Sequence, residues 1–248
     1  MAPPVGFASL PLAELCTSPG VCSSDRGCMR VDPSTYRLST SSAPFIAFEG
    51  INGCGKTTLH RTISERLRAA GHRVRDTREP GGTPLGIELR RLLLEWPGEK
   101  KSDRAELLLF AADRAEHIDK VIRPALHEGE WVLCDRFLYS TITFQGHGRG
   151  IRRDWIDHAN ELAVQGTLPN LVVLLDLDPS EALKRIASRS GNGNDAFEQE
   201  ALSFHTRIRA GFLECADTAP TPFVVLDAMR TPSELVEITS AILGLSPA

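Results

Sequence analysis

Apolar and polar positions alternate in blocks along most of this chain. From Pro44 onward, short β-branched or aromatic runs are separated by longer segments in which apolar residues recur at helical spacing. Short runs of this kind, each followed by a polar turn, are typical of strands. We expect strands at Phe45–Glu49, Arg73–Thr77, Trp131–Asp135, Leu171–Asp176 and Phe223–Asp227. Five strands with helical segments between them predict an α/β fold, in which helices cover both faces of a parallel sheet.

The segments between these runs carry signals that begin and end helices. Thr57–Ala70 stops at Gly71, a residue suited to the position just after a helix. An N-cap residue, a proline at the first helical position and an early acid together mark a helix start. Such signals occur at Asp178-Pro179-Ser180-Glu181 and Thr231-Pro232, and a long helix is expected from about Ser102. These elements predict one domain over residues 44–248.

Residues 1–43 have a different character. They are rich in Ser, Pro, Gly and Cys and show no periodicity, which predicts a disordered extension. Their arginines are offset by acids and no long apolar run is present, so neither a transit peptide nor a secretory signal is supported. Cys16, Cys22 and Cys28 lie here without the paired spacing and nearby His that zinc sites favour.

Composition narrows the class of protein. With 42% hydrophobic and 24% charged residues among 248, the chain can bury a sizeable core. A net charge of −4 gives no general attraction to nucleic acid or to anionic lipid, and no run approaches the ~18 apolar residues of a membrane span. Cys54, Cys134 and Cys215 fit buried or loop thiols of a reducing compartment. We therefore expect a cytoplasmic protein that binds neither nucleic acid nor membrane.

One motif carries a specific chemistry. The segment from Gly50 to Thr57 fits the pattern GxxxxGK[ST], follows an expected strand and opens an expected helix. Glycines let backbone N–H groups converge on phosphate oxygens at the positive end of the helix. Lys56 would reach the β- and γ-phosphates, and Thr57 would ligate Mg²⁺. The alternative is a glycine-rich turn that binds nothing. The expected ATP-binding residues are Gly50, Ile51, Asn52, Gly53, Cys54, Gly55, Lys56, Thr57 and Thr58.

Two further candidates follow expected strands, where α/β sheets bind ligands. Asp135 is a candidate Mg²⁺ partner of Thr57, and Arg136 beside it could hold a phosphate with its planar fork. A local Asp–Arg ion pair is the alternative. Arg78 begins the segment Arg78-Glu79-Pro80-Gly81-Gly82-Thr83, which on its own is also consistent with an ordinary loop.

Two other segments have a functional and a plain interpretation. Phe110 and Arg114 are four residues apart on the helix expected from Ser102, so they share a face that would suit a stacked and hydrogen-bonded base. A core role for Phe110 is the alternative. Arg189 and the glycine-punctuated segment after it resemble a mobile lid over about residues 189–198, able to close on a triphosphate. A solvated helix end is the plain interpretation there.

Taken in order, these motifs resemble the thymidylate kinase family of nucleoside-monophosphate kinases. The segments that carry the resemblance are FxAFEGxNGxGKTT, TREPGGTxLG, LLLFAADR, DRFLYSTITFQGHGRGI, LVVLLDLDP and a KRxxxR lid, over about four-fifths of the chain. The resemblance implies a doubly wound parallel sheet, a homodimer, and transfer of the ATP γ-phosphoryl group to dTMP with Mg²⁺ as cofactor.

The resemblance also assigns roles at matching positions. Phe110 would stack on thymine, Arg114 would donate to it, and Phe144 would crowd the sugar 2′ carbon. Lys56, Arg136 and Arg189 would be catalytic, and Thr57 and Asp135 would hold the metal. The implied dTMP-binding residues are Asn52, Arg78, Arg90, Phe110, Arg114, Arg136, Ser140, Thr141, Phe144 and Gln145.

The chain departs from the family pattern at two positions. Asn52 stands where the family usually has Asp or Glu to engage the dTMP 3′-hydroxyl, and Ala196 stands where the lid usually has Arg. Three alternatives stay open: a degenerate ATP-binding or regulatory protein, a kinase for another deoxypyrimidine nucleotide, and a scaffold. The expected partners are ATP and dTMP, with a second copy of the chain.

Overall fold

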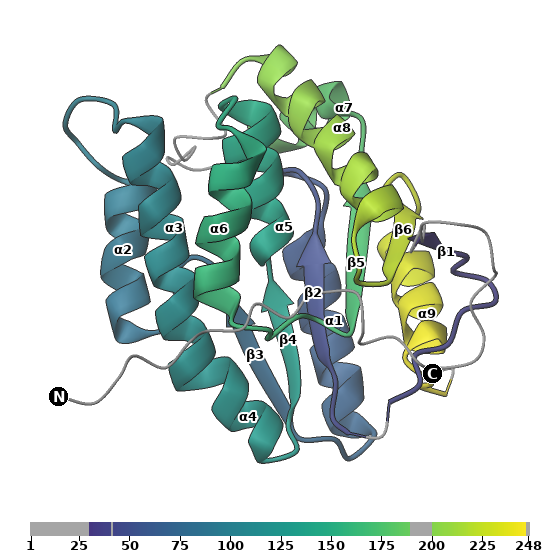
Figure 1. The fold of residues 1–248 in the computed structure, drawn as a ribbon. Coiled ribbons are helices and arrows are strands. Elements are labelled where there is room, and N and C mark those ends of the chain that lie inside the picture. The colour runs from purple at the N-terminus through teal and green to yellow at the C-terminus, as the bar shows by residue number, and fades with distance from the viewer. Residues whose placement is uncertain (1–29, 41, 189–199, 247–248) are drawn as a thin grey trace, which may run out of the picture.

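A parallel sheet of six strands, in the order β1-β6-β5-β2-β4-β3, forms the centre of the molecule (Figure 1). The structure is a computed structural model that describes residues 30–40, 42–188 and 200–246. The strands are β1 Arg30–Val31, β2 Phe45–Glu49, β3 Val74–Arg78, β4 Trp131–Asp135, β5 Leu171–Asp176 and β6 Phe223–Asp227.

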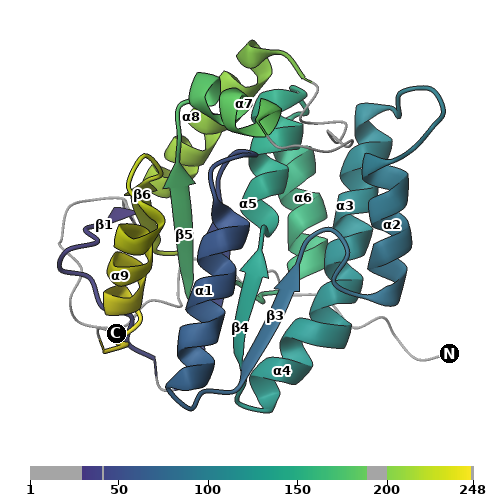
Figure 2. The same ribbon diagram turned by 180° about the vertical axis from the view of Figure 1, so that it is seen from behind.

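Helices cover both faces of the sheet, as the sequence predicts. Helices α1 and α9 pack against each other on one face (Figure 2), and α5, α6 and α8 lie on the other (Figure 1). The helices are α1 Lys56–Ala69, α2 Pro84–Leu94, α3 Asp103–His117, α4 Arg123–His127, α5 Leu138–Thr141, α6 Arg153–Val164, α7 Pro179–Ala187, α8 Leu202–Thr218 and α9 Pro232–Ile242, with π-helical segments η1 Ile118–Ile122 and η2 Ile142–Gly148.

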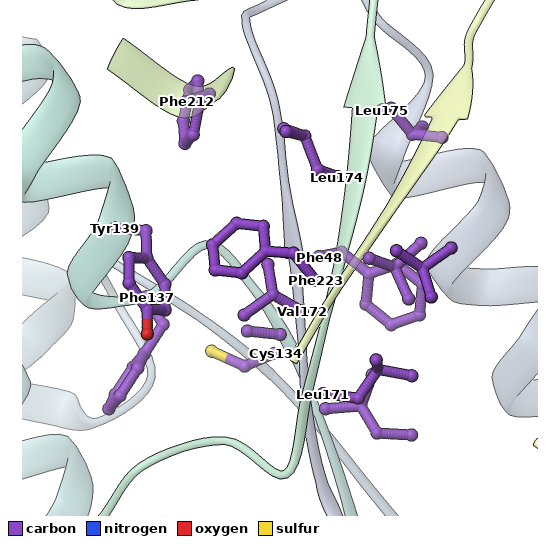
Figure 3. Packing of buried hydrophobic residues seen from close by; sticks show 14 of the residues in the cluster. Phe48, Cys134, Phe137, Tyr139, Leu171, Val172, Leu174, Leu175, Phe212 and Phe223 are labelled. Carbon is purple, nitrogen blue, oxygen red and sulfur yellow. The ribbon is translucent and has the colours of Figure 1, made fainter. Parts of the chain in front are cut away.

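The core follows from the apolar strands at the middle of the sheet. Every residue of β2 is buried, as are the first five of β5, because helices cover both of their faces. Aromatic rings from the α5 face pack edge-on against the sheet, with 4.7 Å between the ring centroids of Tyr139 and Phe223 (Figure 3). The edge strand β3 is instead mostly exposed and carries charges, which discourage pairing with another sheet.

The sixth strand corrects the expectation for the N-terminal segment. Residues 30–40, expected to be disordered, include β1, which pairs in parallel with β6. The Leu38 amide donates to Ile242 O at 2.8 Å, and the side chains of Val31, Tyr36 and Leu38 pack against the core. These half-buried side chains contribute the apolar burial that a wholly disordered segment would lack.

The expected element boundaries hold closely for the other strands. Four of them have the predicted bounds, and β3 is shifted by one residue, so that Arg78 ends the strand. The Asp178 side chain caps α7 as predicted, and α3 begins at the expected place, where the Ser102 side chain caps it. Thr231 and Glu234 form a reciprocal capping box at α9.

Strand order explains where a ligand can bind. In the sheet, β4 and β3 lie on one side of β2, and β5 and β6 lie on the other. The connection that follows β2 leads to the β3 side, and the later connection that follows β4 leads to the β5 side, so the two leave the carboxyl edge in opposite directions. A crevice opens at such a switch point. Among the described residues, no helix is long and apolar enough to span a bilayer.

Candidate active site

A cleft of about 630 Å³ lies at this carboxyl edge. It is bounded by the loop between β2 and α1, the loop after β3, helix α3 and the segment after β4. The sequence-predicted residues that line it are Asn52, Gly53, Gly55, Lys56, Thr57, Thr58, Arg78, Arg90, Phe110, Arg114, Asp135, Arg136, Ser140, Thr141, Phe144 and Gln145. Gly50, Ile51 and Cys54 are not among its lining residues. Arg189 and the expected lid at 189–198 lie outside the described residues.

The loop between β2 and α1 has a backbone that only glycine accommodates easily. Gly50 has φ 137°, and a Cβ there would lie 2.5 Å from Leu175 O. Gly55 has φ 99° and precedes the first residue of α1, and no side chain among the described residues caps this helix. The first N–H groups of α1 are therefore left for a ligand, at the positive end of the helix dipole.

Lys56 is held inside this loop. Its ammonium donates to Gly50 O and Ile51 O at 3.1 Å each, and the residue is only 6% exposed. A lysine that binds phosphate in a preformed loop would be expected to be exposed, whereas the structure buries this side chain. Burial lowers the pKa of Lys56, and the nearby charge of Arg136 lowers it further. A phosphate anion at this point would favour the charged ammonium.

Thr57 and Asp135 meet across neighbouring strands. Phe48 of β2 is in register with Asp135 of β4, which brings the end of β4 beside the start of α1. Thr57 Oγ1 donates to Asp135 Oδ2 at 2.8 Å. Burial alone would raise the pKa of Asp135, but Lys56, Arg136 and the Thr57 hydrogen bond outweigh it and lower the pKa. An ionised carboxylate beside a hydroxyl is a suitable oxygen pair for Mg²⁺.

Arg136 connects the P-loop with the segment after β4. Its Nη1 donates to Gly50 O at 2.9 Å and to Ser140 Oγ at 3.1 Å, and its Nη2 donates to Asn52 Oδ1. The guanidinium lies 5.0 Å from the centroid of the Phe144 ring. Its backbone φ of 72° is uncommon for a residue with a side chain and indicates that the surroundings hold it in place. The structure thus fixes a cation between the two halves of the cleft.

Glu49 is a residue that the sequence reasoning missed. It is fully buried at the end of β2 and accepts hydrogen bonds from Phe137 N (2.9 Å), Ser140 N (3.1 Å) and Ser140 Oγ (2.6 Å). Burial raises the pKa of Glu49, while the nearby Arg136 opposes the shift. Its carboxyl group orients the start of α5. An acid at the end of an otherwise apolar strand was the available signal.

Arg114 is anchored below the opposite end of the cleft. Its Nε donates to Glu79 Oε2 at 2.8 Å, and its Nη1 donates to Thr141 Oγ1 (3.0 Å) and Asn160 Oδ1 (2.8 Å). Arg114 Nη2 also lies 2.8 Å from Glu79 Oε2. A guanidinium has five N–H donors, so one Nη2 hydrogen remains without a partner among the described residues. Phe110, one turn earlier on α3, lines the cleft beside it.

Two carboxyl groups lie buried beneath this end. Glu79 Oε1 is 2.9 Å from His117 Nδ1, and Asp113 Oδ1 accepts from Gly81 N at 3.0 Å. Asp113 Oδ2 is buried and has no hydrogen-bond partner in the part of the chain that the structure describes. Burial, and then the negative charge of Glu79, raise the pKa of Asp113 to about 7. Neither Glu79 nor Asp113 was predicted, because the sequence does not show that the β3 loop packs on α3.

Two arginines face the cleft from the β3 side. Arg78 is exposed at the end of β3, and Arg90 projects from α2, with Nη1 donating to Pro80 O at 3.0 Å. A Cβ on Gly81 would lie 3.1 Å from Arg90 Cδ, so glycine permits this close approach. The two positive charges make this end of the cleft suited to an anion.

Comparisons with known proteins agree with this geometry. The family model described as thymidylate kinase matches residues 48–238. A thymidylate kinase from Citrifermentans bemidjiense is 49% identical over 187 residues, covering 74% of this chain and 83% of that protein. One from Solidesulfovibrio magneticus is 43% identical, covering 81% of this chain and 98% of that protein, and one from Deinococcus radiodurans is 46% identical, covering 82% and 97%. The chain belongs to the thymidylate kinase family.

Proposed function

We propose that this protein transfers the γ-phosphoryl group of ATP to dTMP, giving dTDP and ADP. The observation that carries the proposal is one continuous cleft with a P-loop at one end and, at the other, an aromatic ring, a buried arginine and two further arginines. Such a cleft can hold a donor triphosphate and an acceptor monophosphate at the same time. Family membership supports the same reaction.

The donor end would hold the ATP phosphates. The N–H groups at the start of α1, which no described side chain caps, face this end together with the Lys56 ammonium, and both would stabilise phosphate oxygens. Gly50 to Thr58 form or support this cradle, although Gly50, Ile51 and Cys54 lie behind its surface. We assign donor binding to the whole segment on this basis.

Mg²⁺ is the cofactor that the donor end fits best. Thr57 Oγ1 and Asp135 Oδ2 lie 2.8 Å apart, and magnesium in phosphoryl-transfer sites favours hydroxyl and carboxylate oxygens together with water and phosphate. When bound, the ion would neutralise charge on the β- and γ-phosphate oxygens. Thr57 and Asp135 are the residues that would hold it.

The acceptor end would hold dTMP. Phe110 would stack on the thymine ring and the remaining Arg114 N–H would donate to a ring carbonyl oxygen, while Ser140, Thr141 and Gln145 line the same end. Arg78 and Arg90 would hold the monophosphate, and Phe144 would crowd the sugar. Asn52, which accepts from Arg136, would lie near the 3′-hydroxyl.

The transfer step needs alignment and charge neutralisation more than proton transfer. An oxygen of the dTMP phosphate forms a bond to the γ-phosphorus as the bond to the β–γ bridging oxygen breaks, and ADP leaves with that electron pair. The attacking oxygen is already anionic at neutral pH, so no general base is required. Lys56 and Arg136 would stabilise the charge that develops on the transferred group, and Arg189 would add to them.

A homodimer is the assembly we propose. Helices α2, α3 and α6 lie together at one side of the molecule (Figure 1), and large apolar residues on them are exposed. Leu108 of α3 and Leu162 of α6 are 63% and 76% exposed. Burying such a surface against a second copy would remove it from water. Light scattering of the purified protein tests the dimer, with a monomer at micromolar concentration as the contrary result.

We further propose a cytoplasmic location, consistent with the free thiols of Cys54, Cys134 and Cys215.

The direct test is to identify the product. The protein is incubated with ATP, Mg²⁺ and dTMP, and nucleotides are separated by chromatography, with a chelated sample as control. Formation of dTDP in step with ADP is expected. ATP binding without dTDP would instead favour the degenerate, regulatory alternative, to which the Asn52 and Ala196 departures point.

A further inference from the structure

Gln145 and Glu106 form a buried contact at the acceptor end of the cleft. Gln145 lies on η2 and is only 1% exposed, yet it lines the cleft. Its Nε2 donates a hydrogen bond of 2.9 Å to Oε1 of Glu106 on α3. Glu106 is itself buried. The contact therefore joins two elements on either side of the position proposed for the base.

The chemistry of Glu106 fixes which way the Gln145 amide points. Glu106 forms a salt bridge with Arg149, whose Nε lies 3.3 Å from the same Oε1. A carboxylate in a salt bridge can only accept hydrogen bonds, whereas an amide has one side that donates and one that accepts. Turning the amide over would place Gln145 Oε1 against a Glu106 oxygen and lose the hydrogen bond. The Nε2 group of Gln145 must then face Glu106.

The other side of the amide is left to the cleft. Gln145 Oε1 has no hydrogen-bond donor among residues 30–40, 42–188 and 200–246, and it is not among their buried unpartnered atoms. It therefore offers an acceptor where Gln145 borders the cleft. Thymine and uracil carry an N3–H donor on their pairing edge. Cytosine has an acceptor at N3, which would face this oxygen unfavourably.

We infer that Glu106 is a positioning residue that orients Gln145 to accept from the N3–H of the acceptor base and so excludes cytosine. This inference rests on the proposed function and adds the determinant of base specificity. Arg114 reads the base separately, because its orientation is fixed by Glu79, Thr141 and Asn160. Discrimination against cytosine thus comes from two side chains, Gln145 and Arg114, and different residues hold each of them in its orientation.

The test is Glu106→Gln, assayed with dTMP, dUMP and dCMP. A glutamine at this position can pair with Gln145 in either amide orientation, so the acceptor facing the cleft is no longer fixed. The ratio of kcat/KM for dTMP to that for dCMP should fall about tenfold, as expected for one hydrogen bond. The dTMP to dUMP ratio should not change, because both bases carry N3–H. A merely structural loosening would give no such split.

A folded Glu106→Gln protein whose dTMP to dCMP ratio equals that of the wild type would overturn the inference. If that variant does not fold, the exchanged pair Glu106→Gln with Gln145→Glu keeps the same charge in the cluster. It again presents an acceptor to the cleft, so the wild-type preference for dTMP over dCMP should be retained. Loss of preference in the exchanged pair overturns the inference. A wild-type protein that phosphorylates dTMP and dCMP equally overturns it too, whereas one that phosphorylates neither contradicts the proposed function itself.

Discussion

The Thr57 hydroxyl, in the first turn of α1, donates a 2.8 Å hydrogen bond to Asp135, which ends β4 and lies 78 positions away in the chain. The contact exists because β2 and β4 are neighbours in the sheet, although β3 separates them in sequence. Parallel strands end at the same edge, so the residue that follows β2 through the P-loop and the residue that ends β4 face each other. The pair marks where the proposed metal and the phosphates would meet.

Removing this hydroxyl should impair use of Mg²⁺. Thr57→Val keeps the shape of the side chain but loses Oγ1, whereas Thr57→Ser keeps it. We expect the valine variant to lose roughly a hundredfold in kcat and to need more Mg²⁺ for half-maximal rate, because one stabilising ligand is gone. Initial rates over a Mg²⁺ series check this. Equal Mg²⁺ dependence of the two variants would exclude Thr57 as a ligand.

Lys56→Ala should abolish transfer and also cost some stability. The lost ammonium no longer stabilises phosphate oxygens, so kcat should fall by at least about a hundredfold. The buried Lys56 also donates to two carbonyl groups, Gly50 O and Ile51 O, so its loss should lower the free energy of unfolding by roughly 1–3 kcal/mol. Turnover and denaturant unfolding measure the two effects. Wild-type turnover in the folded variant would contradict the P-loop assignment.

Asn52→Asp should improve use of dTMP. Hydrogen bonds with a charged partner contribute about 1.5–3 kcal/mol, against 0.5–1.5 kcal/mol for neutral ones, so a carboxylate should hold the 3′-hydroxyl more firmly. Arg136 already donates to Asn52 Oδ1 and would stabilise the new charge. A gain of roughly 1 kcal/mol, several-fold in kcat/KM, is expected with dTMP but not with its 3′-deoxy analogue. The same response to both acceptors would show that position 52 does not contact the 3′-hydroxyl.

The segment before β2 should contribute to stability. A chain that begins at Pro44 lacks β1 and the half-buried side chains of Val31, Tyr36 and Leu38, which one that begins at Arg30 retains. Their loss should cost roughly 3 kcal/mol and lower Tm by roughly 5–10 °C. Thermal unfolding of the two chains decides the matter. Identical melting temperatures would mean that residues 30–43 add nothing to the fold.

Asp113 should make stability depend on pH. Its pKa is raised from 3.8 to about 7 in the folded protein, mainly by burial, so the folded state binds more protons than the unfolded state between these values. Stability should therefore fall as pH rises from about 4 to about 7, by roughly 2 kcal/mol between pH 5 and 7 from this group. Asp113→Asn should remove that part of the loss. The free energy of unfolding in urea is measured for both proteins across this pH range. The same pH dependence in the wild type and the variant would contradict the raised pKa of Asp113.

Much of the fold could be predicted because its signals are local. β2, β4, β5 and β6 are continuous apolar runs with polar ends, and the caps at Ser102 and Thr231 depend on residues within one turn. β1 has only two residues and no apolar pattern of its own, since pairing with β6 creates it. The π-helical turns of η1 and η2 could not be predicted, because the spacing of apolar residues does not distinguish them from α-helix.

The candidate site divides in the same way. Lys56, Thr57 and Asp135 could be named from the P-loop pattern and from a carboxylate at a strand end. The residues that hold these side chains in place could not be named from the sequence. Glu49 and Glu79 act through partners distant in sequence, and the burial of Lys56 follows from how the loop closes around it. Identifying these contacts requires the packing of the β3 loop, α3 and α5, which a single sequence does not display.

The most direct test of the central claim is a coupled ADP-release assay of the wild-type protein over a panel of nucleoside monophosphates, with dTDP measured in the same samples. We expect dTMP to give the highest kcat/KM, with one dTDP formed for each ADP released. No dTMP-dependent ADP release, or a higher kcat/KM for another monophosphate, would contradict the proposal that this cleft phosphorylates dTMP.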